Sequence, residues 1–265
     1  MRDWYKYSLE DSDVKKFTSA LDYTSYQIKK DYSELDKLFE FDFFNKDFSK
    51  YIYNNLSQKL SGKNLSIGSG WGHLEYHLSK KFDITASDIN KEYANYNKKV
   101  NYIITDILSK EFISNIKYDN AFAPGIIYLF NNEELNIFFE NVKKTLKDNG
   151  NFYLFFRSKD SFFINLLDNY ILPFENLIKF FLKVIKKKKI KIQRNHHGFR
   201  RYNYELEKVI SQNEFTIVST EKLMFKAEYN RSKILKTFGV GKILSFLKLH
   251  PYITVYHLKK SLKPS

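Results

Sequence analysis

The chain of 265 residues has no cysteine, 4 prolines and 9 glycines, and only six arginines beside 38 lysines. The lack of cysteine excludes disulfides, thiolate zinc sites and cysteine nucleophiles. No apolar run reaches the ~18 residues that span a bilayer, and the segment from Met1 to Lys6 has no signal-peptide core. We therefore expect a cytoplasmic protein.

Acidic residues are missing from one long stretch, Asn176 to Tyr204, which carries much of the formal net charge of +14. Its ten basic residues are Lys179, Lys183, Lys186, Lys187, Lys188, Lys189, Lys191, Arg194, Arg200 and Arg201. Basicity is therefore a local feature of the chain. Because arginine, not lysine, is the preferred fork for bidentate contacts to phosphates and bases, the lysine count alone is weak evidence for nucleic-acid binding.

Hydrophobic periodicity predicts one domain with additions, and 43% hydrophobic residues suffice for a single sizeable core. Residues 1–60 show helical stripes and are predicted to form a helical N-terminal cap on a main domain, residues 61–265. Strands are predicted at 63–67, 82–87, 101–105, 118–123, 151–156, 214–220 and 252–258. Because helices separate most of these strands, we expect an α/β fold with a Rossmann-like, mostly parallel sheet covered by helices on both faces.

Two helical insertions, at about 158–202 and 225–250, exceed what that core requires. In the first, an apolar stripe follows Pro173 at helical spacing, with lysines on the complementary face. Its members are Phe174, Leu177, Ile178, Phe181, Leu182 and Ile185. Residues 231–248 repeat the pattern.

These basic amphipathic segments have three interpretations. The stripes pack on the core and the lysines are simply solvated, or residues 173–201 and 231–248 lie on an anionic membrane surface. In the second case the protein would be peripheral at the inner face of a membrane. Contact of the lysine run with RNA phosphates is the weaker third alternative.

The most specific signal is the run Asn64-Leu65-Ser66-Ile67-Gly68-Ser69-Gly70-Trp71-Gly72. A buried strand here turns through closely spaced glycines into an amphipathic helix, so the main chain can approach a ligand that side chains would exclude. Asp88 ends the next apolar stretch, where a carboxylate can accept both hydroxyls of a ribose. The dinucleotide fingerprint G-x-G-x-x-G would need a glycine at His73, and the observed spacing is G-x-G-x-G.

This spacing, with an acidic residue at the next strand end, resembles the class I S-adenosylmethionine-dependent methyltransferases. The resemblance keeps good register over about residues 60 to 160 and continues more loosely to residue 260. It implies a seven-stranded sheet whose last strand is antiparallel, with S-adenosyl-L-methionine as cofactor and Asp106 facing the adenine amino group. The cofactor-binding residues it implies are Ser66, Gly68, Ser69, Gly70, Gly72, Asp88, Ile89, Asp106, Ile107 and Ala123.

Ser66 departs from the family's pattern, which has Asp or Glu two residues before the first glycine. That carboxylate helps to hold the cofactor's amino end, so the resemblance leaves a catalytically inactive S-adenosylmethionine-binding protein as an alternative. On the sequence alone, Ser66→Asp is expected to tighten cofactor binding by roughly 1 kcal/mol, because a charge-assisted hydrogen bond exceeds a neutral one.

Methyl transfer is an in-line displacement at a sulfonium carbon, for which the protein aligns the acceptor and, for a hydroxyl, removes its proton. We expect no metal, and interpret His73 and His77 as a surface pair and not as ligands. His196 and His197 are the best candidates for a base or an acceptor-binding group, because a neutral imidazole can take a proton near pH 7. Tyr128, beyond the fourth strand, is a further candidate.

The acceptor class is indicated only by resemblance. The fourth-strand loop, Ala121 to Gly125, lacks the Asn/Asp-Pro-Pro-Tyr/Phe pattern of enzymes that methylate amino groups of bases. A small-molecule, sugar or lipid-linked acceptor is therefore favoured, with an RNA methyltransferase as the alternative.

Overall fold

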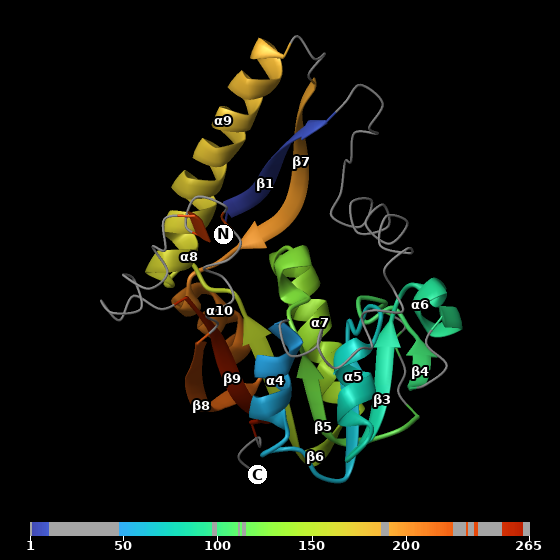
Figure 1. Ribbon diagram of the computed structural model, residues 1–265. Coiled ribbons are helices and arrows are strands. Elements are labelled where there is room, and N and C mark those ends of the chain that lie inside the picture. The colour runs from blue at the N-terminus through green and yellow to red at the C-terminus, as the bar shows by residue number, and fades with distance from the viewer. Residues whose placement is uncertain are drawn as a thin grey trace.

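A computed structural model describes residues 2–10, 48–96, 100–110, 112, 115–186, 191–224, 232, 236–237 and 251–261. Its main body is a seven-stranded sheet with the order β4-β3-β2-β5-β6-β9-β8 (Figure 1). The strands are β2 (Lys63–Ile67), β3 (Asp83–Asp88), β4 (Asn101–Ile104), β5 (Tyr118–Ala123), β6 (Leu146–Phe156), β8 (Phe215–Met224) and β9 (Tyr252–Lys260). The first five of these run parallel, and β9 is antiparallel to both of its neighbours. The predicted sheet with its antiparallel last strand is confirmed.

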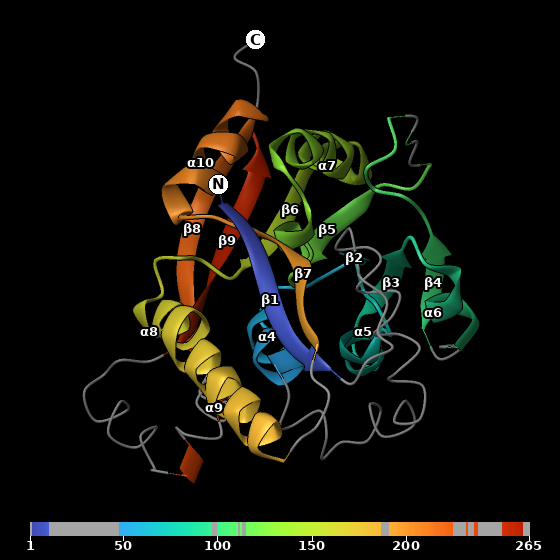
Figure 2. The ribbon, with the colours of Figure 1, turned by 90° about the horizontal axis from the view of Figure 1, so that it is seen from above.

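Helices cover both faces of this sheet, as predicted (Figure 2). They are α4 (Phe48–Leu56), α5 (His73–Leu78), α6 (Lys91–Tyr96), α7 (Asn132–Thr145), α8 (Phe162–Leu166), α9 (Leu172–Ile185) and α10 (Asn203–Gln212), with a short 3-10 helix η2 (Ile127–Leu129) and a π-helical turn η3 (Leu167–Ile171). A capping box formed by Asn131 and Glu134 begins α7, whose apolar side is buried. This local signal sets the start of α7.

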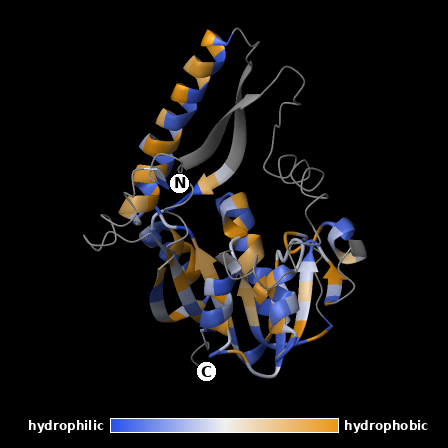
Figure 3. Cartoon of the chain, in the orientation of Figure 1, coloured by the Kyte–Doolittle hydropathy of each residue, from blue (hydrophilic) through white to orange (hydrophobic). Residues whose placement is uncertain are grey.

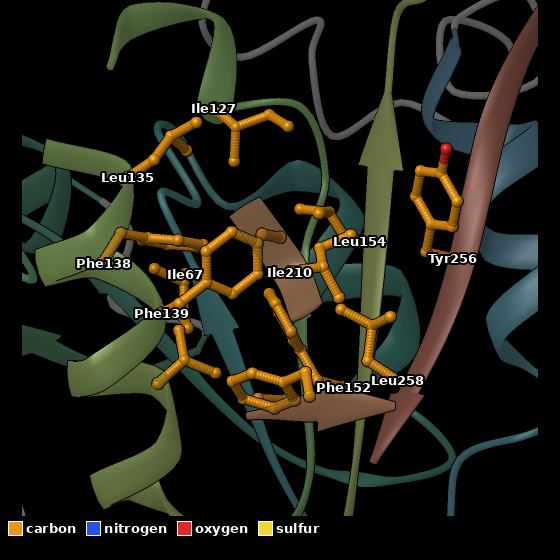
Figure 4. Packing of buried hydrophobic residues seen from close by; sticks show 14 of the residues in the cluster. Ile67, Ile127, Leu135, Phe138, Phe139, Phe152, Leu154, Ile210, Tyr256 and Leu258 are labelled. Atoms are coloured by element: carbon orange, nitrogen blue, oxygen red, sulfur yellow. The ribbon is translucent and has the colours of Figure 1, made fainter. Parts of the chain in front are cut away.

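The core has two layers because the side chains of β6 alternate. Phe152 and Leu154 lie in the layer shared with α7 and α10, where Phe138 and Phe139 surround them (Figure 4). Phe155 lies in the opposite layer with residues of α4 and α5. This period of two buries both faces of a central strand, and it keeps the strand ends at one rigid edge.

Strand β6 begins earlier than predicted. Residues 146–150 resemble a helix end and glycine turn, but they continue the strand, which starts directly after α7. Tyr118 pairs with Leu146 and Asn120 pairs with Asn151, so the extra residues form an irregularity in the ladder. The predicted strand at 151–156 is otherwise confirmed.

A second, smaller sheet pairs β1 (Arg2–Glu10) with β7 (Lys191–Arg200) in antiparallel register. The helical prediction is thus wrong for residues 2–10, and it is wrong for 191–200 within the first insertion. The main-chain N–H and C=O groups of each strand are hydrogen-bonded by the other strand. The periodicity of one segment does not indicate such a distant partner. The helical prediction for 48–56 is confirmed by α4, whereas residues 11–47 lie outside the described part of the chain.

Helix α9 matches the predicted amphipathic helix, with Pro173 in its first turn, but its apolar stripe does not pack on the core. The exposed fractions of the stripe residues run from 38% for Ile178 to 75% for Ile185. Figure 3 shows hydrophobic and hydrophilic residues alternating along the whole helix. The interpretation that this stripe is buried against the domain is therefore wrong.

Of the second insertion, 225–250, only Ser232, Lys236 and Thr237 are described, so its predicted amphipathic helix lies outside the description. Ser232 is buried and donates a hydrogen bond to Glu175 of α9. Within the described residues, no helix is both long and apolar enough to cross a bilayer.

Candidate functional site

The glycine run forms a tight turn between β2 and α5. Gly68, Gly70 and Gly72 have φ angles of 73°, 53° and 69°, all in the left-handed region that favours glycine. The main-chain N–H groups of Gly68 and Ser69 donate to the carbonyl of Ser87 at 2.9 and 3.0 Å. The turn is therefore attached to the end of β3.

The three glycines are not equivalent in their surroundings. A Cβ on Gly68 would lie 2.4 Å from Cδ1 of Ile126, whereas a Cβ on Gly70 would have no atom within 4 Å. Gly68 thus serves close packing inside the fold. Gly70 borders open space, where the main chain can approach a ligand.

Asp88, at the end of β3, organises this turn. Its Oδ2 accepts the N–H of Gly70 at 3.0 Å and its Oδ1 accepts the N–H of Asn90 at 3.1 Å. Burial raises the pKa of Asp88, and hydrogen bonds from the main chain oppose the rise. Since a carboxylate has about four acceptor positions, capacity remains for a ribose hydroxyl.

Tyr102 of β4, which the sequence did not single out, supports the same turn. Its hydroxyl donates to the carbonyl of Gly70 at 2.8 Å. Burial, followed by the nearby Asp88 and Glu75 carboxylates, raises the pKa of Tyr102, so the phenol keeps its proton. β4 has only four residues, and so short a strand has no sequence pattern that would indicate this role.

Glu75 is the second residue that the sequence analysis missed. The side chain of Glu75 comes from α5 and accepts a hydrogen bond from the Ser66 hydroxyl at 2.5 Å. Both residues are buried, with only 1% of Glu75 exposed. The signal was present in the sequence, because Glu75 lies three residues before Leu78 and so shares the buried face of α5 with it.

The residues predicted for the nucleoside end lie around this turn. Ile89, beside Asp88, exposes 49% of its surface, and Asp106 lies exposed after β4, where its carboxylate accepts the N–H of Leu108.

Three other predicted residues are turned toward the protein. Ile107 is buried. The side chain of Ala123 lies in the core cluster, so only its main chain can meet a ligand. Ser69 donates to the carbonyl of Ser66.

The segments that carry the acceptor candidates meet where β7 packs against η2. Gly198 of β7 lies so close to η2 that a Cβ there would be 2.2 Å from the carbonyl oxygen of Tyr128. Trp4 of β1 pairs with Gly198, and the next residue, Tyr5, pairs with His196. His197 is therefore the extra residue of a β-bulge. The side chains of both histidines lie outside the description, so their roles remain predictions.

Two consecutive arginines, Arg200 and Arg201, hold the end of β7 in place. Arg201 is fully buried, and its guanidinium donates to the carbonyls of Ile127 and Phe130. Arg200 donates to Asp168 of η3 at 2.6 Å. From here on, the name cap denotes β1 with residues 158–186 and 191–200, and no longer the helical cap predicted at 1–60. These residues lie above the carboxyl ends of the parallel strands (Figure 1).

The two helix histidines do not form the predicted surface pair. His77 is buried, and burial lowers the pKa of His77 to about 4, so its imidazole is neutral at pH 7. His73 lies 2.5 Å from the hydroxyl of Ser49 on α4. In the described part of the chain, no three His, Cys, Asp or Glu residues are grouped to hold a metal ion.

No protein-family model and no curated protein sequence matches the chain. Solved structures do match it. The 1,6-didemethyltoxoflavin-N1-methyltransferase of Burkholderia thailandensis, crystallised with its substrate and S-adenosylhomocysteine, is 11% identical with a TM-score of 0.53, over 97% of this chain and 96% of that one. The chain has the class I methyltransferase fold.

Two further structures support this fold assignment. The magnesium protoporphyrin IX methyltransferase of Synechocystis PCC 6803, with bound S-adenosylhomocysteine, is 12% identical with a TM-score of 0.52, over 82% of this chain and 84% of that one. An S-adenosylmethionine-dependent methyltransferase of Methanosarcina mazei is 16% identical with a TM-score of 0.52, over 79% and 98% of the two chains. In an open α/β sheet of this kind, ligands bind outside the carboxyl ends of the strands.

Proposed function

We propose that the protein binds S-adenosylmethionine at the glycine turn and transfers its methyl group to a small-molecule or lipid-linked acceptor. One observation carries this proposal: Gly70 borders open space, and the carboxylate of Asp88 accepts a hydrogen bond from the N–H of Gly70. Such a pair offers main chain to a ligand and a carboxylate to its ribose. The neighbours crystallised with S-adenosylhomocysteine support the same cofactor.

The residues at the site suit this cofactor. Asp88 would hold the ribose hydroxyls, Ile89 would cover one face of the adenine, and Asp106 would accept from its amino group. When bound, the cofactor supplies an activated methyl group on a sulfonium. The task of the chain is to align an acceptor with that group and exclude water, which a rigid strand edge and a covering cap can do.

For a hydroxyl acceptor, a base is needed, and we propose His196 or His197 with Tyr128 nearby. The bulge at His197 supports this choice, because bulges redirect side chains beside active sites. The neighbours' names describe methylation of a toxoflavin precursor and of magnesium protoporphyrin. These names favour a small organic acceptor for this chain as well.

Calorimetry with S-adenosylhomocysteine tests the cofactor proposal. Wild-type protein should bind it, and Asp88→Asn should bind it at least tenfold more weakly, about the contribution of a hydrogen bond to a charged group. Asp83→Asn is the matched control, because Asp83 is the exposed residue at the opposite end of β3. Binding of NAD without binding of S-adenosylhomocysteine would refute the proposal.

Labelled S-adenosylmethionine then separates catalysis from binding. Incubation with a lysate fractionated into lipid, RNA, protein and small molecules should label the lipid or small-molecule fraction. Label in the RNA fraction would establish the alternative, an RNA methyltransferase. Binding without label in any fraction would establish an inactive cofactor-binding protein.

We also propose that α9 contacts an anionic lipid surface at the inner face of a membrane. Its exposed stripe includes Phe174, Phe181 and Ile185, and the exposed Lys179 and Lys186 lie on the adjoining face. Burying one such apolar side chain contributes about 1.5–3 kcal/mol, and each lysine near an anionic surface about 1 kcal/mol. Apolar and cationic residues together match anionic lipid more closely than they match RNA.

Cosedimentation with phosphatidylglycerol vesicles tests the lipid surface. Phe181→Gln with Ile185→Gln should abolish recovery on these vesicles and leave S-adenosylhomocysteine affinity unchanged. Val218→Gln with Ile116→Gln is the matched control, since both residues are about half exposed but lie outside α9. Recovery should fall as salt rises, because screening acts over about 8 Å at physiological ionic strength. Equal recovery of the α9 variant and wild type would refute the surface, and salt-sensitive retention on RNA would favour the alternative.

A further inference from the structure

The buried pair of Ser66 and Glu75 lies directly beneath the glycine turn. Ser66 is the penultimate residue of β2, and Glu75 is the third residue of α5. The turn from Gly68 to Gly72 joins these two elements. A carboxylate is therefore present at this position of the fold, but the helix and not the strand supplies it.

Among the residues that the structure describes, little balances the charge of this carboxylate. The Ser66 hydroxyl is its side-chain donor, and the charged groups that act on it are His73, which favours ionisation, and Asp88, which opposes it. Neither lysine nor arginine is among them. Burial is the largest influence and raises the pKa of Glu75. Buried carboxylates are normally paired with a cation, and the described part of the chain supplies no lysine or arginine as the positive group for this one.

The proposed cofactor carries such a group at its amino-acid end. The Asp88 carboxylate, on the other side of the turn, suits the ribose, so a ligand that crosses the turn has its opposite end toward α5. We infer that Glu75, held by Ser66, supplies the negative charge for the cofactor's ammonium group. This inference rests on the proposed function, and it makes Ser66 part of the binding site instead of a sign of lost activity.

The inference reverses an expectation from the sequence. Ser66→Asp was expected to tighten cofactor binding, but the Ser66 oxygen lies 2.5 Å from a carboxylate oxygen. A second carboxylate there would repel Glu75 or keep a proton, because two close carboxylates do not both ionise. We now expect Ser66→Asp to weaken binding.

Two ligands that differ only in the amino-acid end provide the test. Glu75→Gln should weaken S-adenosylhomocysteine about tenfold by calorimetry and change 5′-methylthioadenosine, which lacks that end, by less than twofold. Glu92→Gln, on the half-buried glutamate of α6, should change neither. Without ligand, the melting temperature of Glu75→Gln should not fall, since a neutral amide is less costly to bury.

The outcomes separate the inference from the proposed function. Equal weakening of both ligands by Glu75→Gln, or no weakening of S-adenosylhomocysteine, would overturn the role of Glu75. Wild-type protein that binds neither ligand would overturn the cofactor itself. A charge exchange is the second test: Ser66→Asp combined with Glu75→Ser should recover S-adenosylhomocysteine affinity lost in Glu75→Ser alone. No recovery would count against the assignment.

Discussion

Gly68 and Gly70 both have a left-handed φ angle but differ in their surroundings, which allows packing and ligand approach to be tested separately. Gly68→Ala places a methyl group against Ile126 and should destabilise the fold by more than the ~1–2 kcal/mol of a left-handed alanine. Gly70→Ala meets no protein atom and should cost only that backbone strain. Chemical denaturation measures both changes.

The same two variants should differ in the opposite sense in ligand binding. Gly70→Ala should lose most of its affinity for S-adenosylhomocysteine although it remains the better folded, because its methyl group occupies space that the ligand needs. A Gly70→Ala variant that binds as wild type does would show that the ligand does not approach the main chain there.

At the scale of elements, a buried ion pair that the sequence did not suggest joins η3 and β7 within the cap and reaches Arg157 at the end of β6. Asp168 of η3 pairs with Arg200 of β7 at 2.6 Å and lies 3.7 Å from Arg157, at the end of β6, with 3% of its side chain exposed. Asp168→Asn removes the negative charge that faces Arg157 and Arg200. Removing one partner of a buried pair costs about 3–5 kcal/mol.

We expect Asp168→Asn to loosen the cap without unfolding the sheet. Trypsin should cleave within residues 158–200 much faster than in wild type, while the circular dichroism of the main domain is retained. Asp148→Asn is the matched control, because its ion pair with Lys260 is exposed and 3.8 Å long. Unchanged cleavage of Asp168→Asn would show that this ion pair does not hold the cap together.

At the scale of the whole molecule, buried carboxyls link stability to pH. The pKa of Glu75 is raised above its ordinary value of 4.5 by burial. The folded state therefore binds this proton more tightly than the unfolded state, and its contribution is present below the unfolded pKa and lost as pH rises through the folded pKa.

Without ligand, Glu75→Gln and wild type should thus be about equally stable at pH 4. The variant should gain relative stability as pH rises above that value. Thermal unfolding across this range measures the difference, and Glu92→Gln serves as its control. A difference that shrinks with rising pH would contradict a raised pKa.

The sequence alone determined the strands of the main sheet, apart from the start of β6, and the glycine turn. The alternation in β6 and the left-handed glycines at 68, 70 and 72 are properties of neighbouring residues, so they can be read from the chain directly. Asp88 was predicted at the strand end for the same reason. The helix α9 was also predicted, because Pro173 and the apolar stripe are local signals.

Only the tertiary structure decided which distant segments meet. The pairing of β1 with β7 joins Arg2 to Arg200, and in the described residues each of these strands pairs with the other alone. Whether the stripe of α9 is covered, and where Glu75 points, likewise depend on how elements pack. Periodicity determines which face of an element is apolar. What covers that face depends on the balance of burial and chain entropy over the whole chain.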